Sequence, residues 1–135
     1  MKKIKIGFLP LYIKLYDDCG FVVRPRTEPF YEKLASALED EGFEVVRSPF
    51  CSVKPEFEEA IGKFEREGCG VIVTWHAAYS PSLESIEALT KTRLPIVVLD
   101  TTETYDFSAL QDPGEMNYCH GIHGVMDMTN MLRRA

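Results

Sequence analysis

Side chains that combine an apolar body with a polar atom gather in one stretch of the sequence. The β-branched run 71–74 is followed by Trp75, the only tryptophan, and then by His76 and Tyr79. The run predicts a strand buried on both faces, so these side chains would lie at its carboxyl end, where open α/β sheets bind ligands. The same spacing also fits Trp75 and Tyr79 closing the top of a core, so it locates a candidate site without assigning its chemistry.

A second group of candidates lies in the long connection 11–26, which contains Tyr12 and Tyr16. Long ordered connections are enriched in functional residues, so both tyrosines are candidate binding residues. Part of this segment could be helical. Arg24 and Arg26 are expected to face solvent.

The run Cys119-His120-Gly121-Ile122-His123 brings three potential metal ligands together. A zinc site would need a second ligand pair at suitable spacing, which the chain lacks, so we expect no structural metal. Cys119 and His120 would point about 100° apart on a helix, which disfavours a thiol–imidazole pair. The four cysteines are expected to be free, buried or half-buried thiols. Asp17-Asp18 and Asp100–Glu103 are interpreted as solvated loop charges, which leaves no cluster for a hard divalent cation.

Composition and missing motifs exclude several classes of protein. The 135 residues fit one α/β domain, 1–135, and the formal net charge of -6 argues against binding to nucleic acid. The apolar runs are too short to cross a membrane, and the amino end lacks the apolar segment of a signal peptide, so a cytoplasmic location is expected. The chain has no G-x-G-x-x-G, Walker A or G-x-S-x-G motif and no phosphate loop of the flavodoxin kind, which disfavours nucleotide or flavin cofactors.

The elements that would position these residues alternate between strand and helix four times. The predicted strands cover residues 4–9, 43–46, 71–74 and 94–99, and Pro10 is expected to end the first. The predicted helices begin at Thr27, near Pro55, at Ser80-Pro81 and at Asp112. The pattern predicts an open doubly wound, mainly parallel four-stranded sheet of flavodoxin-like order 2-1-3-4 with helices on both faces.

Helical spacing also predicts which side chains are buried. The expected buried positions are Phe30, Leu34, Ala37, Leu38, Phe57, Ala60, Ile61, Phe64, Leu83, Ile86, Leu89, Met116, Cys119, Ile122, Met126 and Leu132. Gly121 and Gly124 are expected to admit the close approach of another backbone or of a ligand. The strand 94–99 would be an apolar sheet edge guarded only by Pro95, so we expect it to self-associate or to be covered by the last helix and the segment 101–111.

Three segments resemble the amino-terminal domain of the L-fucose/L-arabinose isomerase family, and the opening segment 8–18 resembles the fucose-isomerase-like members. They are Val73-Thr74-Trp75-His76-Ala77-Ala78-Tyr79-Ser80-Pro81, Leu94-Pro95-Ile96-Val97-Val98-Leu99-Asp100-Thr101 and Met116-Asn117-Tyr118-Cys119-His120-Gly121-Ile122-His123-Gly124. The resemblance implies aldose–ketose isomerisation with a divalent metal, usually manganese, whose ligands lie in later domains that this sequence does not contain.

The resemblance also implies roles for particular residues. By motif position, Trp75, Tyr79 and His120 would contact the sugar of a neighbouring subunit, with Tyr12 to Tyr16 less securely placed and His76 at most lining the site. Aromatic faces suit the apolar face of a sugar, and imidazole suits its hydroxyl groups.

Two classes of function follow. One is an isomerase domain that contributes substrate contacts and an oligomer interface and is inactive without its catalytic domains. The other is a free-standing flavodoxin-like module that binds a sugar or another partner without catalysis. The ending after Arg133-Arg134, before an expected fifth strand, favours the first class.

Overall fold

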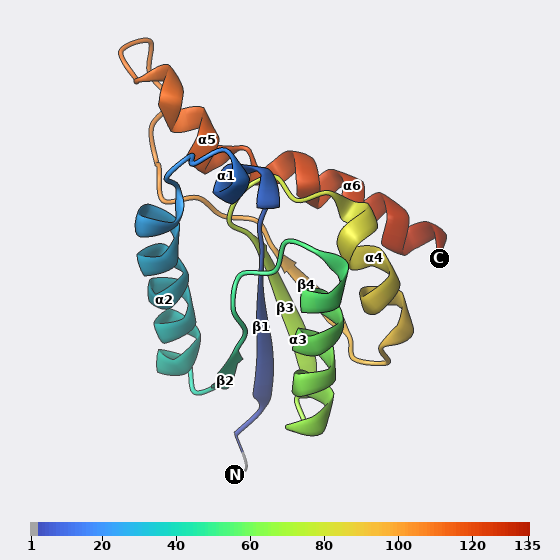
Figure 1. The fold of residues 1–135 in the computed structure, drawn as a ribbon. Helices are drawn as coiled ribbons and strands as arrows, with labels where there is room; N and C mark the ends of the chain where they lie inside the picture. Colours follow the sequence, from blue (N-terminus) through green and yellow to red (C-terminus); the bar gives the residue numbers. More distant parts are fainter. Residues whose placement is uncertain (1–2) are drawn as a thin grey trace.

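Four parallel strands in the order β2-β1-β3-β4 form the sheet in the computed structural model, which describes residues 3–135 (Figure 1). The strands are β1 (Lys5–Leu11), β2 (Glu44–Arg47), β3 (Val71–His76) and β4 (Ile96–Leu99). The predicted α/β class and the flavodoxin-like strand order 2-1-3-4 are therefore confirmed.

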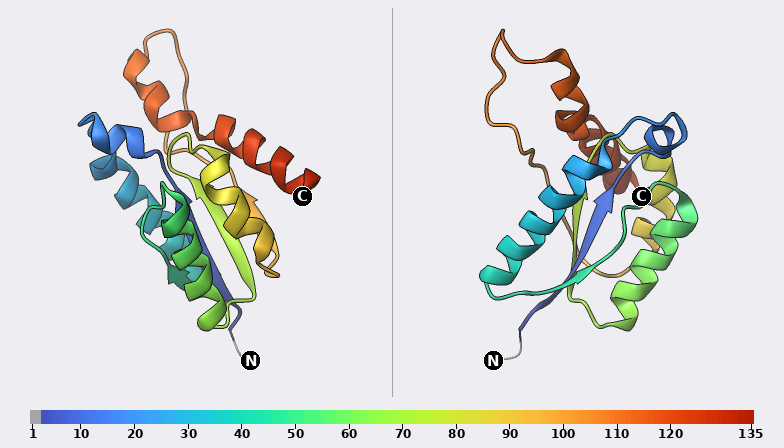
Figure 2. Two further views of the ribbon diagram at one scale, coloured as in Figure 1. Left: turned by 45° about the vertical axis from the view of Figure 1, so that its right-hand side comes forward. Right: turned by 60° about the vertical axis from the view of Figure 1, so that its left-hand side comes forward.

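Helices cover both faces of the sheet, as predicted (Figures 1 and 2). Helix α2 (Arg24–Asp40) packs on one face, and α3 (Lys54–Arg66), α4 (Ser82–Lys91) and α6 (Gly121–Arg134) pack on the other. The short helices α1 (Lys14–Asp18), η1 (Pro113–Glu115) and α5 (Met116–Cys119) belong to the connections near the carboxyl ends of the strands. Within residues 3–135, none of the helices combines the length and the apolar character needed to cross a membrane.

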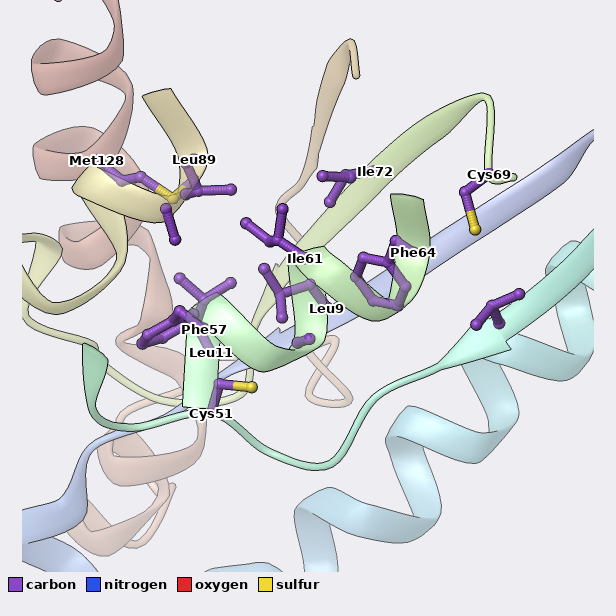
Figure 3. Packing of buried hydrophobic residues seen from close by; sticks show 13 residues of the cluster. Leu9, Leu11, Cys51, Phe57, Ile61, Phe64, Cys69, Ile72, Leu89 and Met128 are labelled. Atoms are coloured by element: carbon purple, nitrogen blue, oxygen red, sulfur yellow. The ribbon is translucent and has the colours of Figure 1, made fainter. Parts of the chain in front are cut away.

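Each face of the sheet has its own hydrophobic cluster. Under α2, Phe8 of β1 stacks on Tyr31 with ring centroids 4.7 Å apart. On the opposite face, Leu9 and Ile72 pack against Phe57 and Phe64 of α3 (Figure 3). The alternation along β1 explains the division, because successive side chains of a strand point to opposite faces.

Strand β1 runs two residues beyond its predicted end, through Pro10 to Leu11. The Pro10 carbonyl accepts a hydrogen bond from the Cys51 N–H at 3.0 Å, so the backbone of Pro10 faces the β2 side. Strand β2 has already ended at Arg47, and the missing N–H of Pro10 therefore interrupts no ladder at that position. The prediction that Pro10 ends the strand was wrong for this reason.

Two helix starts also differ from the prediction. Helix α2 begins at Arg24, and Thr27 lies buried inside it with its hydroxyl donating to the Val23 carbonyl. Helix α4 begins at Ser82, one residue beyond the predicted first turn, and the buried Ser80 hydroxyl caps nothing. In both places a proline in or next to the first turn supplies a helix-compatible backbone without a side-chain cap.

Predicted helix ends and one predicted buried stripe are confirmed. Gly42 and Gly68 follow α2 and α3 in the left-handed conformation, at φ 94° and 73°. Phe57, Ala60, Ile61 and Phe64 of α3 are all buried. On α2, Ala37 is exposed, and the buried positions are Thr27, Phe30, Tyr31 and Ala35.

Small residues occupy several inward positions of α4 and α6 in place of predicted large ones, while the predicted burial of Leu89 is confirmed. Leu83 is 75% exposed, while Ser82, Ser85, Ala88 and Leu89 are buried on α4. The predicted last helix is divided at His120, and Met116, Ile122 and Met126 are exposed while Gly121, Gly124 and Met128 are buried. Helix α4 packs between α3 and α6, so small inward residues allow these helices to approach one another.

Candidate functional site

The candidate site lies at the carboxyl ends of β1 and β3, where the connections diverge to opposite faces of the sheet. The strands are paired up to Leu11 and His76; the chain after β1 leads to α2 on one face, and the chain after β3 leads to α4 on the other. This topological switch point is where open α/β sheets bind ligands. The junction between α5 and α6 lies over the same edge, because Gly121 packs against the backbone of His76.

Tyr16 and His120 form a hydrogen-bonded pair at this edge, although they are 104 positions apart. The Tyr16 hydroxyl is 2.9 Å from His120 Nε2, and His120 Nδ1 is 2.9 Å from the Met116 carbonyl oxygen. A carbonyl can only accept, so a neutral His120 carries its proton on Nδ1 and its Nε2 accepts from Tyr16. Burial lowers the pKa of His120 and raises that of Tyr16, which favours this neutral pair.

The pair leaves the oxygen of Tyr16 able to accept a hydrogen bond from a ligand while its proton is directed at His120. Tyr16 also borders a hollow of about 290 Å³ between α1 and α2, lined in addition by Asp17, Phe21 and Arg24 among others. This volume lies near the lower end of the range for small-molecule sites, ~300–1,000 Å³. The hollow combines an aromatic wall with an ion pair, since Arg24 donates two hydrogen bonds to the Asp17 carboxylate, at 2.6 and 2.9 Å.

Tyr12 lies beneath Tyr16 and supports it. The two rings meet edge to face with centroids 6.0 Å apart, and the Arg24 guanidinium lies 4.6 Å from the Tyr12 ring centroid. Tyr12 is fully buried, and this burial raises its pKa to about 12. Its role in this arrangement is to position Tyr16 and Arg24.

Trp75 is placed on the α2 side of the sheet, within the core. Its ring stacks on Tyr31 with centroids 6.2 Å apart and meets Phe30 edge to face at 5.6 Å, and only 3% of the residue is exposed. Its indole N–H donates to the Thr101 carbonyl at 3.0 Å, which ties the segment after β4 to β3. In this conformation the indole offers no free face to a ligand.

His76 points to the opposite face and is 5% exposed. Neither of its ring nitrogens has a hydrogen-bond partner among residues 3–135, and burial lowers its pKa to about 4. A Cβ placed on Gly124 would lie 2.6 Å from the imidazole, so only glycine permits α6 to pack here. This contact confirms the predicted close approach at Gly121 and Gly124. Tyr79, in the turn after β3, is half-buried.

The structure therefore brings Tyr12, Tyr16 and His120 together and places His76 below the α5–α6 junction. Trp75 is buried in the same α2-side cluster as Tyr12, where the Phe50 ring lies between them with centroids 6.2 and 5.6 Å away. Sequence reasoning missed the partnership of Tyr16 with His120, because no local spacing links residues so far apart.

The two arginines expected to face solvent are instead engaged. Arg26 donates to both carboxylate oxygens of Glu115 at 2.6 and 2.8 Å, reaches Glu103 at 3.3 Å and lies over the Tyr118 ring. These contacts fix both ends of the segment between β4 and α5 to the start of α2. In the sequence, the acidic residues Glu103 and Glu115 indicated that Arg26 had candidate partners. Their pairing with Arg26 depends on tertiary structure.

Among residues 3–135, the structure contains no group of three or more His, Cys, Asp and Glu side chains that could hold a metal ion. Asp17 and Asp18, interpreted above as solvated charges, pair with Arg24 and Lys14. His120 and His123 belong to different surroundings, since His120 is bonded to Tyr16 while His123 is exposed. The described residues therefore offer no manganese centre of their own; the family resemblance implies metal ligands that lie in later domains, outside this sequence. All four cysteines are free, with Cys51 and Cys69 buried, Cys119 half-buried and Cys19 exposed.

Comparison with known proteins adds no assignment: no protein-family model and no curated protein matches this chain.

Proposed function

We propose that this chain is the amino-terminal domain of a ketol isomerase of the L-fucose/L-arabinose isomerase type. In this role it contributes substrate-contacting and oligomer-interface side chains, while a divalent metal, manganese or a similar ion, is held by residues outside this sequence. The sequence motifs support the family, and the flavodoxin-like sheet is compatible with it. The observation that carries the proposal is the Tyr16–His120 pair at the switch point, because it presents an oriented phenol beside a hollow.

The chemistry of the edge suits a polyhydroxylated ligand. A sugar hydroxyl can donate to the Tyr16 oxygen while the phenol O–H continues to donate to His120 Nε2, and other hydroxyls can reach the Asp17 carboxylate and the Arg24 guanidinium. Phe21, whose ring centroid lies 5.0 Å from that of Tyr16, offers an aromatic face for the C–H groups of the sugar ring. Trp75 contributes indirectly, because its indole N–H donates to the Thr101 carbonyl and so holds the segment that leads to His120.

Complementation tests this proposal directly. The chain should restore aldose–ketose turnover, with manganese present, to a family isomerase from which the amino-terminal domain has been removed. It should show no turnover alone, because residues 3–135 offer no metal-binding cluster. Tyr16→Phe should restore much less, and Leu15→Ala, at a 55%-exposed position of α1 that does not line the hollow, should restore turnover as well as the unmodified chain. Equal restoration by Tyr16→Phe, or none by the unmodified chain, contradicts the proposal.

A second candidate function is a free-standing sugar-binding module without catalysis. It is favoured by the fact that Tyr16, His120 and the hollow all come from this one chain. Titration of the full chain with aldoses and ketoses, followed through the imidazole NMR signals, separates the two. A shift of the His120 signal that is lost in Tyr16→Phe, without any complementation, assigns the chain to this second class.

A further inference from the structure

The segment after β4 forms an irregular arm that projects from the body of the molecule (Figures 1 and 2). Three large apolar side chains on it are exposed, Tyr105 at 95%, Phe107 at 64% and Leu110 at 96%. The base of the arm is fixed, because Arg26 holds Glu103 before it and Glu115 after it. A clamped segment that presents three apolar side chains to water is typical of a contact surface.

An apolar groove of about 550 Å³ lies along β4, between α4 and the end of α6. Its apolar lining consists of Leu89, Leu94, Ile96, Val98, Leu132 and Ala135. The ends of α4 and α6 that line the groove lie away from the arm of the same chain (Figures 1 and 2). The arm therefore needs a second molecule to reach such a groove.

The outer edge of β4 beside the groove is open within residues 3–135, where β4 pairs with β3 alone. The Pro95 carbonyl accepts from the Ile72 N–H at 2.9 Å, so the backbone of Pro95 faces β3. Alternate residues of a strand direct their backbone groups to opposite sides, so Ile96 and Val98 turn theirs outward. Pro95 thus does not guard the outer edge as the sequence suggested, and an extended segment can add to it.

Charge makes the arm and the groove complementary. The segment 94–132, which includes the arm, has no lysine or arginine and contains Asp100, Glu103, Asp106, Asp112, Glu115 and Asp127. Arg133 lines the groove, and the exposed Arg93 and Arg134 are sequence neighbours of its lining residues. Two carboxylates lie at the same rim, because Lys91 pairs with Glu87 and the Thr92 hydroxyl donates to Glu65. By contrast, the apolar hollow of about 400 Å³ beside α3 is lined by Glu56 and Glu59 with Lys63, which would disfavour an acidic arm.

We propose that residues 104–111 of one copy bind the β4 groove of a second copy. Residues 104–108 of the arm belong to no helix, strand or turn, and the chain then turns at 108–111, where the Gln111 N–H donates to the Ser108 carbonyl at 3.1 Å. Residues 104–107 therefore lie along Ile96 and Val98 of the second copy, and the turn brings Leu110 beside them. Phe107 and Leu110 enter the apolar groove, and Asp106 lies toward Arg133 at its rim. The inference does not depend on a sugar or a metal, and the substrate-contacting part of the proposed function is tested separately, by complementation with Tyr16→Phe.

Sedimentation of the full chain over a range of concentrations tests the proposal. The unmodified chain should associate reversibly, and Phe107→Asp with Leu110→Asp should raise the dissociation constant by about tenfold or more. Leu83→Asp is the matched control, since Leu83 is 75% exposed on α4 and should leave association unchanged. A monomer at all concentrations, or equal association of the arm variant, overturns the proposal.

The groove is tested separately with a synthetic peptide of residues 101–112, added to the full-length arm variant. Amide NMR signals of Ile96, Val98 and Leu132 should shift, and a scrambled peptide should leave them in place. Arg133→Glu with Arg134→Glu, both exposed, should weaken peptide binding severalfold, and added salt should weaken binding to the unmodified groove. Shifts confined to residues around Glu56 and Glu59 would assign the arm to the other hollow and contradict the inference.

Discussion

Helices α3 and α6 pack on the same face of the sheet in opposite ways. Helix α3 buries its large side chains, including Phe57 and Phe64, against β1 and β3 (Figure 3). Helix α6 turns Gly121 and Gly124 to the sheet, where they meet His76, and leaves Ile122 and Met126 outside at 38% and 54% exposure. Burial of large side chains is thus concentrated at α3, whereas α6 buries Met128 but keeps Ile122 and Met126 at its surface.

The largest expected difference in the free energy of unfolding is between the truncation of a large side chain on α3 and the truncation of one on α6. Phe57→Ala should lower the free energy of unfolding by about 3–5 kcal/mol, because the residue is fully buried and leaves a cavity. Met126→Ala should change it by no more than about 0.5 kcal/mol, since the side chain is half in water. Urea unfolding followed by far-ultraviolet circular dichroism measures both. Similar losses in the two variants would show that α6 is held by its large side chains after all.

The contrast between α3 and α6 also explains which parts of the fold the sequence predicts and which it does not. Strand order, the α3 stripe and the glycine helix ends follow from local periodicity and backbone preference, and these predictions are confirmed. The inner faces of α4 and α6 do not follow, because hydrophobic spacing selects large residues whereas close helix packing selects small ones. Periodicity therefore placed Leu83 and Met126 on the wrong side of their helices.

The candidate site was predictable as a location and only partly as a set of residues. The rule that ligands bind at strand ends led to the end of β3, the length of the connection 11–26 led to Tyr12 and Tyr16, and the family resemblance led to His120. The sequence alone could not show which face of the sheet Trp75 occupies. Strand alternation places Trp75 and His76 on opposite faces, but it does not show which of these faces α2 covers. The engagement of Arg26 with Glu115 likewise required tertiary structure.

The second prediction concerns acid sensitivity at the contact between β3 and α6. Burial lowers the pKa of His76 from 6.5 to about 4, so between these values the unfolded chain takes up a proton that the folded chain does not. The stability should therefore be unaffected by His76 above pH 6.5 and should decrease as the pH falls toward 4, by up to ~3 kcal/mol. Urea midpoints at pH 7 and pH 4.5 measure this change.

Two variants identify the histidine responsible. His76→Gln removes the titrating group and should flatten this part of the pH profile, whereas His123→Gln, at an exposed position of α6, should retain it. The depressed carboxyl pKa values of Asp17 and Glu115, caused by hydrogen bonds from Arg24 and Arg26, affect all three proteins equally. An unchanged profile in His76→Gln would show that the imidazole is hydrated under α6 and that the packing there is looser than described.

The smallest effect is also the sharpest, because it should differ in sign between the two helices. A Cβ on Gly124 would lie 2.6 Å from His76 Cδ2 and 3.2 Å from the Ser80 backbone nitrogen, neither of which is the free end of a flexible chain. Gly124→Ala should therefore cost about 1–3 kcal/mol, even though alanine favours the helix by about 1 kcal/mol. On α3, a Cβ at Gly62 meets only the guanidinium of Arg66, at 3.1 Å, and this exposed side chain can move aside. Gly62→Ala should consequently stabilise the chain by up to about 1 kcal/mol, as measured by thermal and urea unfolding of the two variants in parallel. Stabilisation by both substitutions would mean that α6 can withdraw from β3 at little cost, so that the junction over the candidate site opens readily.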